Sequence, residues 1–333
     1  MGREREENNL IMKKIVFFSI PAYGHTNPTI EVVHELTKAG NKVWYYSFNE
    51  FKEKIEGAGA KFISCDNFIQ KLNKKDEKRV GKDFSFLIEM VVDMTLALDE
   101  KVSSDLKKIK LLRENGYKVD NIISLVSNNN DTKTIVYTSK EFQPLSETFG
   151  SKYAFVGPSV AKIEVVKEDR KKKKIYISLG TVNNKNNRFY KNCIKAFKDT
   201  DIDVIMSIGK STNISDLGEI PKNFVIKNVA QQIKVLQDVD LFITHSGMNS
   251  VNESLYYGVP MVLYPRQSEQ GMVANRVSEL KAGILLKKND SIDIKEAALK
   301  VLNNDTYKEG AKALENSFVL SGGAKKAADF IVE

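Results

Sequence analysis

Short apolar runs, each about the length of one strand, alternate along this chain with segments of helical periodicity. The first run, Ile15-Val16-Phe17-Phe18-Ser19-Ile20, is apolar almost throughout, which is typical of a strand covered on both faces in a parallel sheet. The alternation predicts α/β architecture with right-handed helical crossovers. Further strands are expected at 42–48, 61–64, 134–138, 153–156, 174–178, 202–207, 224–227, 241–244 and 260–263, and helices at 28–39, 50–56, 84–109, 189–198, 249–257, 270–280, near Gln232 and from 292 to the end.

The alternation occurs twice, which predicts two doubly wound, Rossmann-like domains that face a cleft. A chain of 333 residues with a hydrophobic share of 42% is long enough for two cores. Gly157-Pro158, followed by a strongly charged stretch, is the clearest shift in composition. We therefore expect a disordered extension at 1–12, an N-terminal domain at 13–157, a linker at 158–172 and a C-terminal domain at 173–333.

Composition argues against export, a membrane span and nucleic-acid binding. Cys65 and Cys193 lie far apart without disulfide-framework or zinc-site spacing, and no apolar run approaches the roughly 20 residues of a membrane helix. The net charge of +8 does not by itself separate nucleic acid, membrane and phosphorylated ligands. Because the basic cluster at 170–174 lacks aromatic neighbours, it is interpreted as a solvated linker. We expect a cytoplasmic protein with no nucleic-acid or membrane partner, and the oligomeric state is left open.

The segment 241–253 combines an apolar strand, a short turn and a helix start. In open α/β sheets, ligands lie beyond the carboxyl ends of the strands, where a helix N-terminus offers free N–H groups and a positive dipole end to phosphate. We therefore expect His245, Gly247, Asn249 and Ser250 to contact a diphosphate, and Glu253 to accept hydrogen bonds from a ribose diol. Taken singly, each of these residues is equally compatible with a strand end, a helix cap or a first-turn acid.

Together these residues form the pattern His-x-Gly-x-Asn-Ser-x-x-Glu, and with it the chain resembles the UDP-glycosyltransferase superfamily, especially its bacterial macrolide-glycosyltransferase branch. The resemblance implies a GT-B fold and inverting transfer of a hexose, favouring glucose, from a UDP-sugar to a hydroxyl of a small apolar acceptor. It also implies no cofactor and no metal ion, because the family stabilises its leaving diphosphate with protein donors.

The resemblance extends along the C-terminal half. Glu269-Gln270 matches the family's acidic-glutamine pair that binds sugar hydroxyls, and Ser178-Leu179-Gly180-Thr181 is similar to a turn near the donor phosphates, which assigns Thr181 to the diphosphate. Val229, Ala230 and Gln232 occupy the place of the uracil-binding turn. The departures are Gln231 where proline is usual, Val229 where plant members carry tryptophan, Arg266 where glutamine is common, and Lys281 where glycine is usual.

In the N-terminal half, Pro21-Ala22-Tyr23-Gly24-His25-Thr26-Asn27-Pro28 matches the family's Gly-His-x-x-Pro turn, with Thr26 or Asn27 expected to cap the helix that follows. The resemblance makes His25 the candidate general base, because an imidazole with a pKa near neutrality takes a proton from an attacking hydroxyl. The alternative is a helix-entry histidine bonded to the backbone. His34, in the middle of the same helix, is expected at the surface or half-buried.

The resemblance breaks after about residue 110, where a strand–helix–strand portion of the family pattern is absent. In the family this portion carries the aspartate that orients the base histidine, and its first strand neighbours the opening strand. Asp105, Asp120 and Asp131 lie nearby in the sequence, but none follows an apolar strand, so none is assigned that role. Three alternatives remain open: a shortened glycosyltransferase with weak or lost activity, a nucleotide-sugar-binding protein without catalysis, and a sequence that lacks an internal segment of the protein. A nucleotide-sugar epimerase of the same fold is a further alternative.

Overall fold

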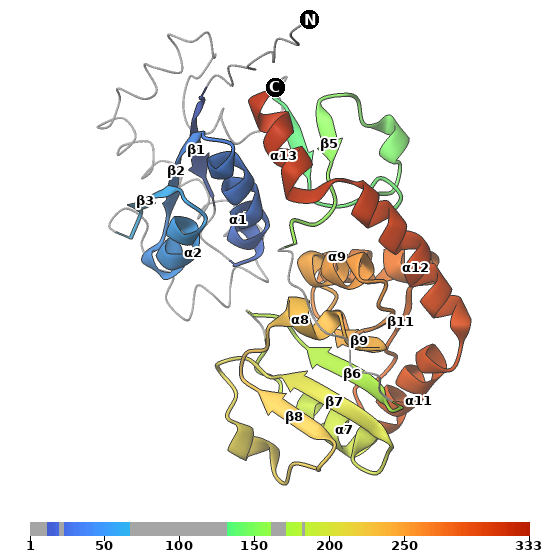
Figure 1. The fold of residues 1–333 in the computed structure, drawn as a ribbon. Coiled ribbons are helices and arrows are strands. Elements are labelled where there is room, and N and C mark those ends of the chain that lie inside the picture. Colours follow the sequence, from blue (N-terminus) through green and yellow to red (C-terminus); the bar gives the residue numbers. More distant parts are fainter. Residues whose placement is uncertain (1–11, 20–22, 67–131, 161–170, 182–183) are drawn as a thin grey trace, which may run out of the picture. The chain divides into compact units, whose positions relative to one another are not determined.

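The computed structural model of the chain describes residues 12–19, 23–66, 132–160, 171–181 and 184–333. The chain divides into two compact units, Met1–Thr134 with Ala328–Glu333, and Ile135–Ala327 (Figure 1). The expected extension at 1–12 lies outside the described residues except for Met12. The expected helix at 84–109 and the three aspartates considered above lie outside them as well.

The first unit contains a three-stranded parallel sheet in the order β1-β2-β3, formed by β1 (Lys14–Phe18), β2 (Lys42–Ser47) and β3 (Lys61–Ser64). Helix α1 (Tyr23–Lys38), the 3-10 turn η1 (Asn49–Phe51) and helix α2 (Lys52–Gly57) connect the strands. The core gathers apolar residues from α1, β2 and α2 that are almost fully buried. They include Val32, Val33, Leu36, Tyr45, Phe51 and Ile55.

Helix α1 begins earlier than the expected cap at Thr26 or Asn27, so Pro28 lies in its second turn rather than its first. The ring of Tyr23 packs edge-on against Phe51, with centroids 5.0 Å apart, and Thr26 is fully buried. Packing of these two residues accounts for the additional turn, and tertiary contacts of this kind commonly override local capping preferences.

The second unit contains a six-stranded parallel sheet in the order β11-β10-β9-β6-β7-β8. The chain first builds outward from β6 through β7 to β8, then crosses to the other side of β6 and continues through β9, β10 and β11. This order places a topological switch point between β6 and β9, which is where ligands bind in doubly wound sheets. The strands are β6 (Lys173–Ser178), β7 (Ile202–Ser207), β8 (Phe224–Lys227), β9 (Leu241–Thr244), β10 (Met261–Leu263) and β11 (Gly283–Leu285).

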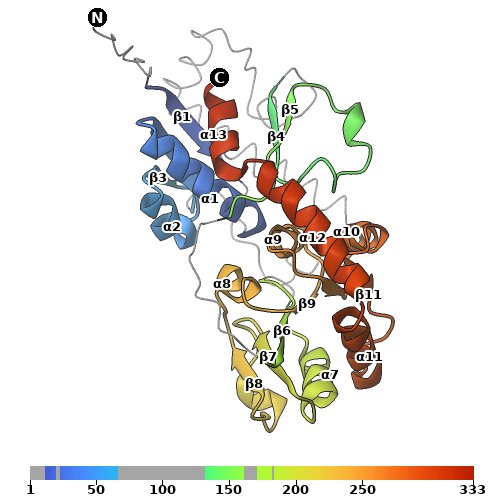
Figure 2. The ribbon, with the colours of Figure 1, turned by 45° about the vertical axis from the view of Figure 1, so that its right-hand side comes forward.

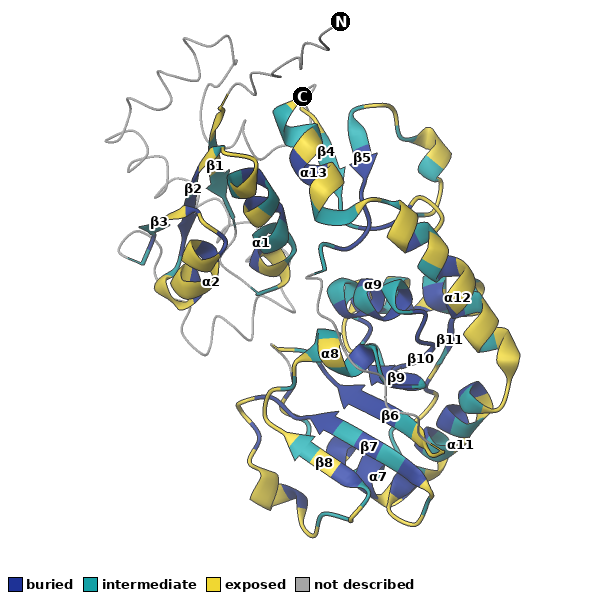
Figure 3. Ribbon diagram, in the orientation of Figure 1, coloured by how far each residue is buried: buried dark blue, intermediate teal, exposed yellow. Residues whose placement is uncertain are grey.

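Helices cover both faces of this sheet (Figures 1 and 2). Along β6, Ile175 and Ile177 pack into one buried cluster, whereas Tyr176 between them packs into the other, as the period of a strand requires. The first cluster includes residues of α7 (Asn187–Phe197) and α11 (Ser291–Leu302), and the second those of α8 (Gln232–Leu236), α9 (Met248–Tyr256), α10 (Ser268–Glu279) and α12 (Asp305–Leu320). In the middle of the sheet, β9 is accordingly buried along its length, and β6 is buried from Ile175 to Ser178 (Figure 3).

Two features of the C-terminal half of the chain differ from the sequence expectation. Strand β11 was not predicted, because its three residues form too short a run to stand out. The single helix expected from 292 to the end is three helices, α11, α12 and α13 (Gly323–Val332). Asn304 caps α12 by accepting from the Thr306 N–H, and Gly322 and Gly323 both adopt positive φ at the second break.

The segment from 135 to 157 belongs with the second unit, so the division lies earlier than the expected linker at 158–172. Its strands β4 (Thr134–Val136) and β5 (Tyr153–Phe155) pair with each other, with the 3-10 turn η2 (Ser146–Thr148) between them. Asn252 of α9 donates to the Tyr137 carbonyl (2.7 Å) and accepts from the Thr138 hydroxyl (3.1 Å). Arg276 of α10 donates to the Phe142 carbonyl (2.8 Å). Residues 161–170 of the expected linker lie outside the described residues.

Three lysines of the basic cluster, at 172–174, are paired with acidic side chains of the second unit. Lys172 contacts Asp201 (2.6 Å), Lys173 contacts Asp240 (3.7 Å) and Lys174 contacts Asp238 (2.5 Å). Local aspartates therefore offset this positive charge. Among the described residues, no helix is long and apolar enough to cross a membrane.

Candidate nucleotide-sugar site

Three turns lie side by side at the carboxyl edge of the six-stranded sheet. Thr244 at the end of β9 is the register partner of both Ser178 at the end of β6 and Leu263 at the end of β10. The turns that follow these three residues therefore adjoin at the switch point. They contain Thr181, the His245–Gly247 turn and the segment leading to Glu269 and Gln270, so the structure brings these predicted residues to one edge.

The turn after β9 is strained and leads directly into α9. Ser246 is fully buried and has a positive φ of 66°, a conformation that residues other than glycine seldom adopt and that concentrates at functional sites. Gly247 is the N-cap of α9 and has no side chain to bond the first N–H groups. The helix thus begins at the sheet edge with the positive end of its dipole at this turn.

The imidazole of His245 lies between two glycines. A Cβ added at Gly180, where φ is +79°, would be 2.5 Å from Cε1 of the ring, and one added at Gly247 would be 2.5 Å from Nε2. Both distances are far inside van der Waals contact, so the ring occupies space that only glycine leaves. Sequence reasoning identified Gly247 as a position of close approach but missed this role for Gly180.

Burial, together with the positive charge of Arg266, lowers the pKa of His245 to about 4. The imidazole is therefore neutral at pH 7 and carries one N–H donor. Its Nδ1 atom is buried and has no hydrogen-bond partner among the described residues. A buried polar atom without a partner is costly, and a phosphate oxygen would satisfy it.

The carboxylate of Glu253 accepts a hydrogen bond from a residue of α8. The Gln232 amide donates to the Glu253 carboxylate (2.6 Å) and to the Ser250 hydroxyl (3.2 Å), and its own oxygen accepts from the Tyr176 hydroxyl (3.3 Å). Burial raises the pKa of Glu253, and the Gln232 hydrogen bond acts in the opposite direction. The Gln232 amide, predicted to bind uracil, thus contacts the predicted ribose carboxylate. Sequence reasoning missed Tyr176, because the pattern of a strand does not show which group a tyrosine hydroxyl contacts.

The predicted sugar-binding pair lies in the first turn of α10. Gln270 is buried, accepts from the Arg266 N–H (2.9 Å) and donates to Gln267 Oε1 (3.2 Å). Glu269 is exposed, and partial burial of its carboxyl raises its pKa.

The remaining predicted residues are mostly exposed. Thr181 follows β6, Val229 lies between β8 and α8 with a relative exposure of 63%, and Ala230 and Asn249 are partly buried. His25 lies in the first turn of α1 and is exposed, as is His34 on the same helix. His25 belongs to the first unit, whereas the other candidates belong to the second.

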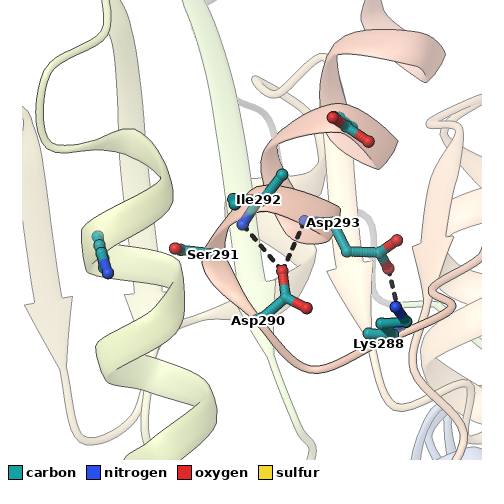
Figure 4. Close-up of a pocket in the computed structure, with 7 residues that line it drawn as sticks. Lys288, Asp290, Ser291, Ile292 and Asp293 are labelled. Carbon is teal, nitrogen blue, oxygen red and sulfur yellow. Dashed lines mark hydrogen bonds between the residues drawn. The ribbon is translucent and has the colours of Figure 1, made fainter.

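A separate hollow of about 430 Å³ is lined by residues of α7, α11 and the loop before α11 (Figure 4). Its two aspartates already have partners: Asp290 accepts from the Ile292 and Asp293 N–H groups (3.1 and 2.9 Å), and Asp293 accepts from the Lys288 N–H (2.7 Å). It shares no residue with the carboxyl-edge site. Among the described residues, no group of three or more His, Cys, Asp or Glu side chains is arranged to hold a metal ion.

Comparison with known proteins identifies the family of the chain. Residues 191–324 match the family described as Erythromycin biosynthesis protein CIII-like, C-terminal domain. The chain is 30% identical to the uncharacterized UDP-glucosyltransferase YojK of Bacillus subtilis, with 97% of each chain covered. It is 32% identical to the NDP-glycosyltransferase YjiC of Bacillus licheniformis, with 96% of this chain and 97% of the relative covered.

The alignment with YojK spans 397 positions, whereas the chain has 333 residues. At least 64 aligned positions therefore have no residue in this chain. Among solved structures, the calicheamicin glycosyltransferase CalG4 superposes with a TM-score of 0.76 at 22% identity, covering 97% of this chain and 98% of that one. The fold is therefore GT-B. A chain aligned with these relatives over nearly its whole length is a glycosyltransferase, and it belongs to the UDP-glycosyltransferase superfamily, in its bacterial macrolide-glycosyltransferase-like branch.

Proposed function

We propose that the chain transfers a hexose, glucose in the first instance, from a UDP-sugar to a hydroxyl of a small apolar acceptor, with inversion and without a metal ion. The names of two relatives, a UDP-glucosyltransferase and an NDP-glycosyltransferase, support this donor class. The observation that carries the proposal is the His245 imidazole, neutral and fixed between two glycines, with a buried Nδ1 atom that has no partner among the described residues.

The donor would bind along the carboxyl edge of the six-stranded sheet. His245 and the first N–H groups of α9 face the diphosphate, together with Thr181, Asn249 and Ser250. Glu253 accepts from the ribose hydroxyls, while Val229, Ala230 and Gln232 adjoin uracil. Glu269 and Gln270 bind the sugar. These donors stabilise the charge that develops on the diphosphate because they are fixed before the reaction begins.

In the transfer step, the acceptor oxygen forms a bond to the anomeric carbon as the bond from that carbon to the β-phosphate oxygen breaks. The electron pair of the broken bond leaves with UDP, and the acceptor proton passes to His25. Attack from the face opposite the leaving group inverts the configuration. General-base catalysis of this kind contributes roughly 10²–10⁴ in rate.

We expect transfer to be slow in this chain. The aligned positions that it lacks support the absence of the segment that carries the orienting aspartate in the family. Among the described strands, β1 pairs only with β2, and Val16 on β1 is 37% exposed; both agree with the absence of the neighbouring strand. Without an orienting carboxylate the imidazole loses its preferred tautomer and part of the stabilisation of its charged form. A nucleotide-sugar-binding protein is therefore the second candidate.

Calorimetry with UDP in the presence of a chelator tests the donor site. The wild type should bind, and His245→Ala should lose about 1.5–3 kcal/mol, the usual contribution of a hydrogen bond to a charged group. Equal affinity in both proteins would remove His245 from the site. A mass-spectrometric screen of UDP-sugars against phenolic and macrolide acceptors then separates transfer from binding alone, and an altered UDP-sugar formed without acceptor would identify an epimerase instead.

A further inference from the structure

The loop after β10 carries a positive charge at the edge of the donor site. The side chain of Arg266 in this loop is exposed. The Tyr264 N–H donates to the Thr244 carbonyl (2.8 Å), which extends the β9–β10 pairing by one residue. The segment from Tyr264 to Arg266 therefore begins beside the turn that contains His245.

The backbone of this loop is fixed by the side chain predicted to bind the sugar. The Arg266 N–H donates to Gln270 Oε1 (2.9 Å), and Gln270 Nε2 donates to Gln267 Oε1 (3.2 Å). Since Gln270 is itself buried, the loop closes onto the first turn of α10. Arg266 thus adjoins the predicted sugar site through its backbone and the predicted diphosphate site through the neighbouring turn.

The guanidinium charge of Arg266 affects the pKa of two groups on different elements. After burial, Arg266 is the second cause that lowers the pKa of His245. It also acts against the effect of burial on the Tyr190 phenol of α7, whose pKa burial raises. The charge of Arg266 therefore reaches both the switch-point turn and the helix that follows β6.

The charges at the site leave a role for this cation. His245 is neutral at pH 7 because of its low pKa, so it donates a hydrogen bond but no net charge. Glu253 and Glu269 would be unfavourable neighbours for a diphosphate, which gains further negative charge as the bond to the sugar breaks. An arginine fork is well suited to phosphate oxygens and remains charged throughout the reaction.

We propose that Arg266 binds the donor diphosphate and stabilises the departing UDP, and so supplies the positive charge that His245 does not. The inference rests on the proposed donor site. It extends that site by assigning an arginine of the loop after β10 to the leaving group.

The test measures UDP, UMP and uridine affinities by calorimetry for Arg266→Gln, Arg266→Lys and a control, Lys300→Gln. The control removes one exposed charge in the last turn of α11. Arg266→Gln should weaken UDP by roughly 10-fold, weaken UMP less and leave uridine unchanged. Arg266→Lys should retain most of the affinity because it keeps the charge, and the control should match the wild type. The loss should shrink at high salt.

Unchanged UDP affinity in Arg266→Gln, alongside normal binding by the wild type, would overturn the inference and leave the donor site standing. Equal losses for UDP and uridine would also overturn it, by showing that Arg266 acts through the loop backbone. If Arg266→Gln weakened the affinity for UDP-glucuronate and left the affinity for UDP unchanged, Arg266 would bind a sugar carboxylate. That result would overturn its role at the diphosphate. Failure of the wild type to bind UDP would instead refute the proposed function.

Discussion

The sheets of the two units are both parallel, but their strands are covered differently. In the second unit every residue of β9 is buried, and β6 alternates between two apolar clusters. In the first unit β1 is exposed or half-exposed along its length, and its Phe17 and Phe18 stack on β2 tyrosines. The comparison indicates that the donor half keeps the double covering of a doubly wound sheet, whereas β1 does not show it among the described residues.

The largest expected effect tests whether the first unit still contributes chemistry. His25→Ala should lower turnover by roughly 10²–10⁴ while UDP affinity stays nearly unchanged, because base catalysis and donor binding use different residues. His34→Ala, an exposed histidine on the same helix, is the matched control and should behave as wild type. Robust transfer that persists in His25→Ala would refute both the base assignment and the expected defect.

The next effect tests how tightly the second unit fixes its imidazole. Gly180→Ala places a methyl group 2.5 Å from the His245 ring at a positive φ, which should cost about 1–3 kcal/mol of stability. UDP affinity should fall at least as far as in His245→Ala, because the ring must move. The control is Gly271→Ala in α10, where an added Cβ meets nothing within 4 Å. Denaturation that shows the same stability for both variants would contradict the packing argument.

A smaller effect concerns pH. The pKa of His245 is about 4 in the folded chain and about 6.5 when unfolded, so the unfolded chain binds more protons between these values. The contribution of His245 to the free energy of unfolding is fully present above about pH 6.5 and is lost as the pH falls toward 4. Between pH 7 and 5 the wild type should lose about 2 kcal/mol relative to His245→Gln. Parallel pH profiles of unfolding free energy in the two proteins would show that the imidazole is not buried as described.

The smallest effect separates two roles for Gln232. If its amide acts by orienting Glu253, a double-mutant cycle of Gln232→Ala and Glu253→Ala should show a coupling of about 1 kcal/mol for UDP. The coupling should vanish for 2′,3′-dideoxy-UDP, which lacks the ribose hydroxyls. Additive losses that persist with the dideoxy nucleotide would indicate direct contact between Gln232 and uracil.

The sequence predicted most of the second unit because its strands have the composition of fully covered strands. The expected strands at 202–207, 224–227 and 241–244 coincide with β7, β8 and β9. Prediction was weaker where tertiary contacts decide the structure. The early start of α1 depends on the contact of Tyr23 with Phe51, and the break after α11 depends on the cap at Asn304.

In the site, too, local features could be predicted from the sequence and tertiary contacts could not. The switch-point turn could be located from its sequence, since strand, glycine and helix start follow each other directly. The contact of Gln232 with Glu253 could not, because it joins residues on two helices. The position of the His245 ring against Gly180 likewise depends on the pairing of β6 with β9, which no local pattern encodes.

Asn252 gives α9 a second role. The residue before Glu253 bonds the backbone of Tyr137 and the hydroxyl of Thr138, so the helix that begins at the donor turn also holds the end of β4. Opening the β4–β5 ribbon therefore requires breaking contacts to the same helix that a bound nucleotide would rigidify. Amide hydrogen exchange at Val156 and Gly157, which donate to the carbonyls of Val136 and Thr138, should consequently slow when UDP binds, although neither residue belongs to the proposed donor site.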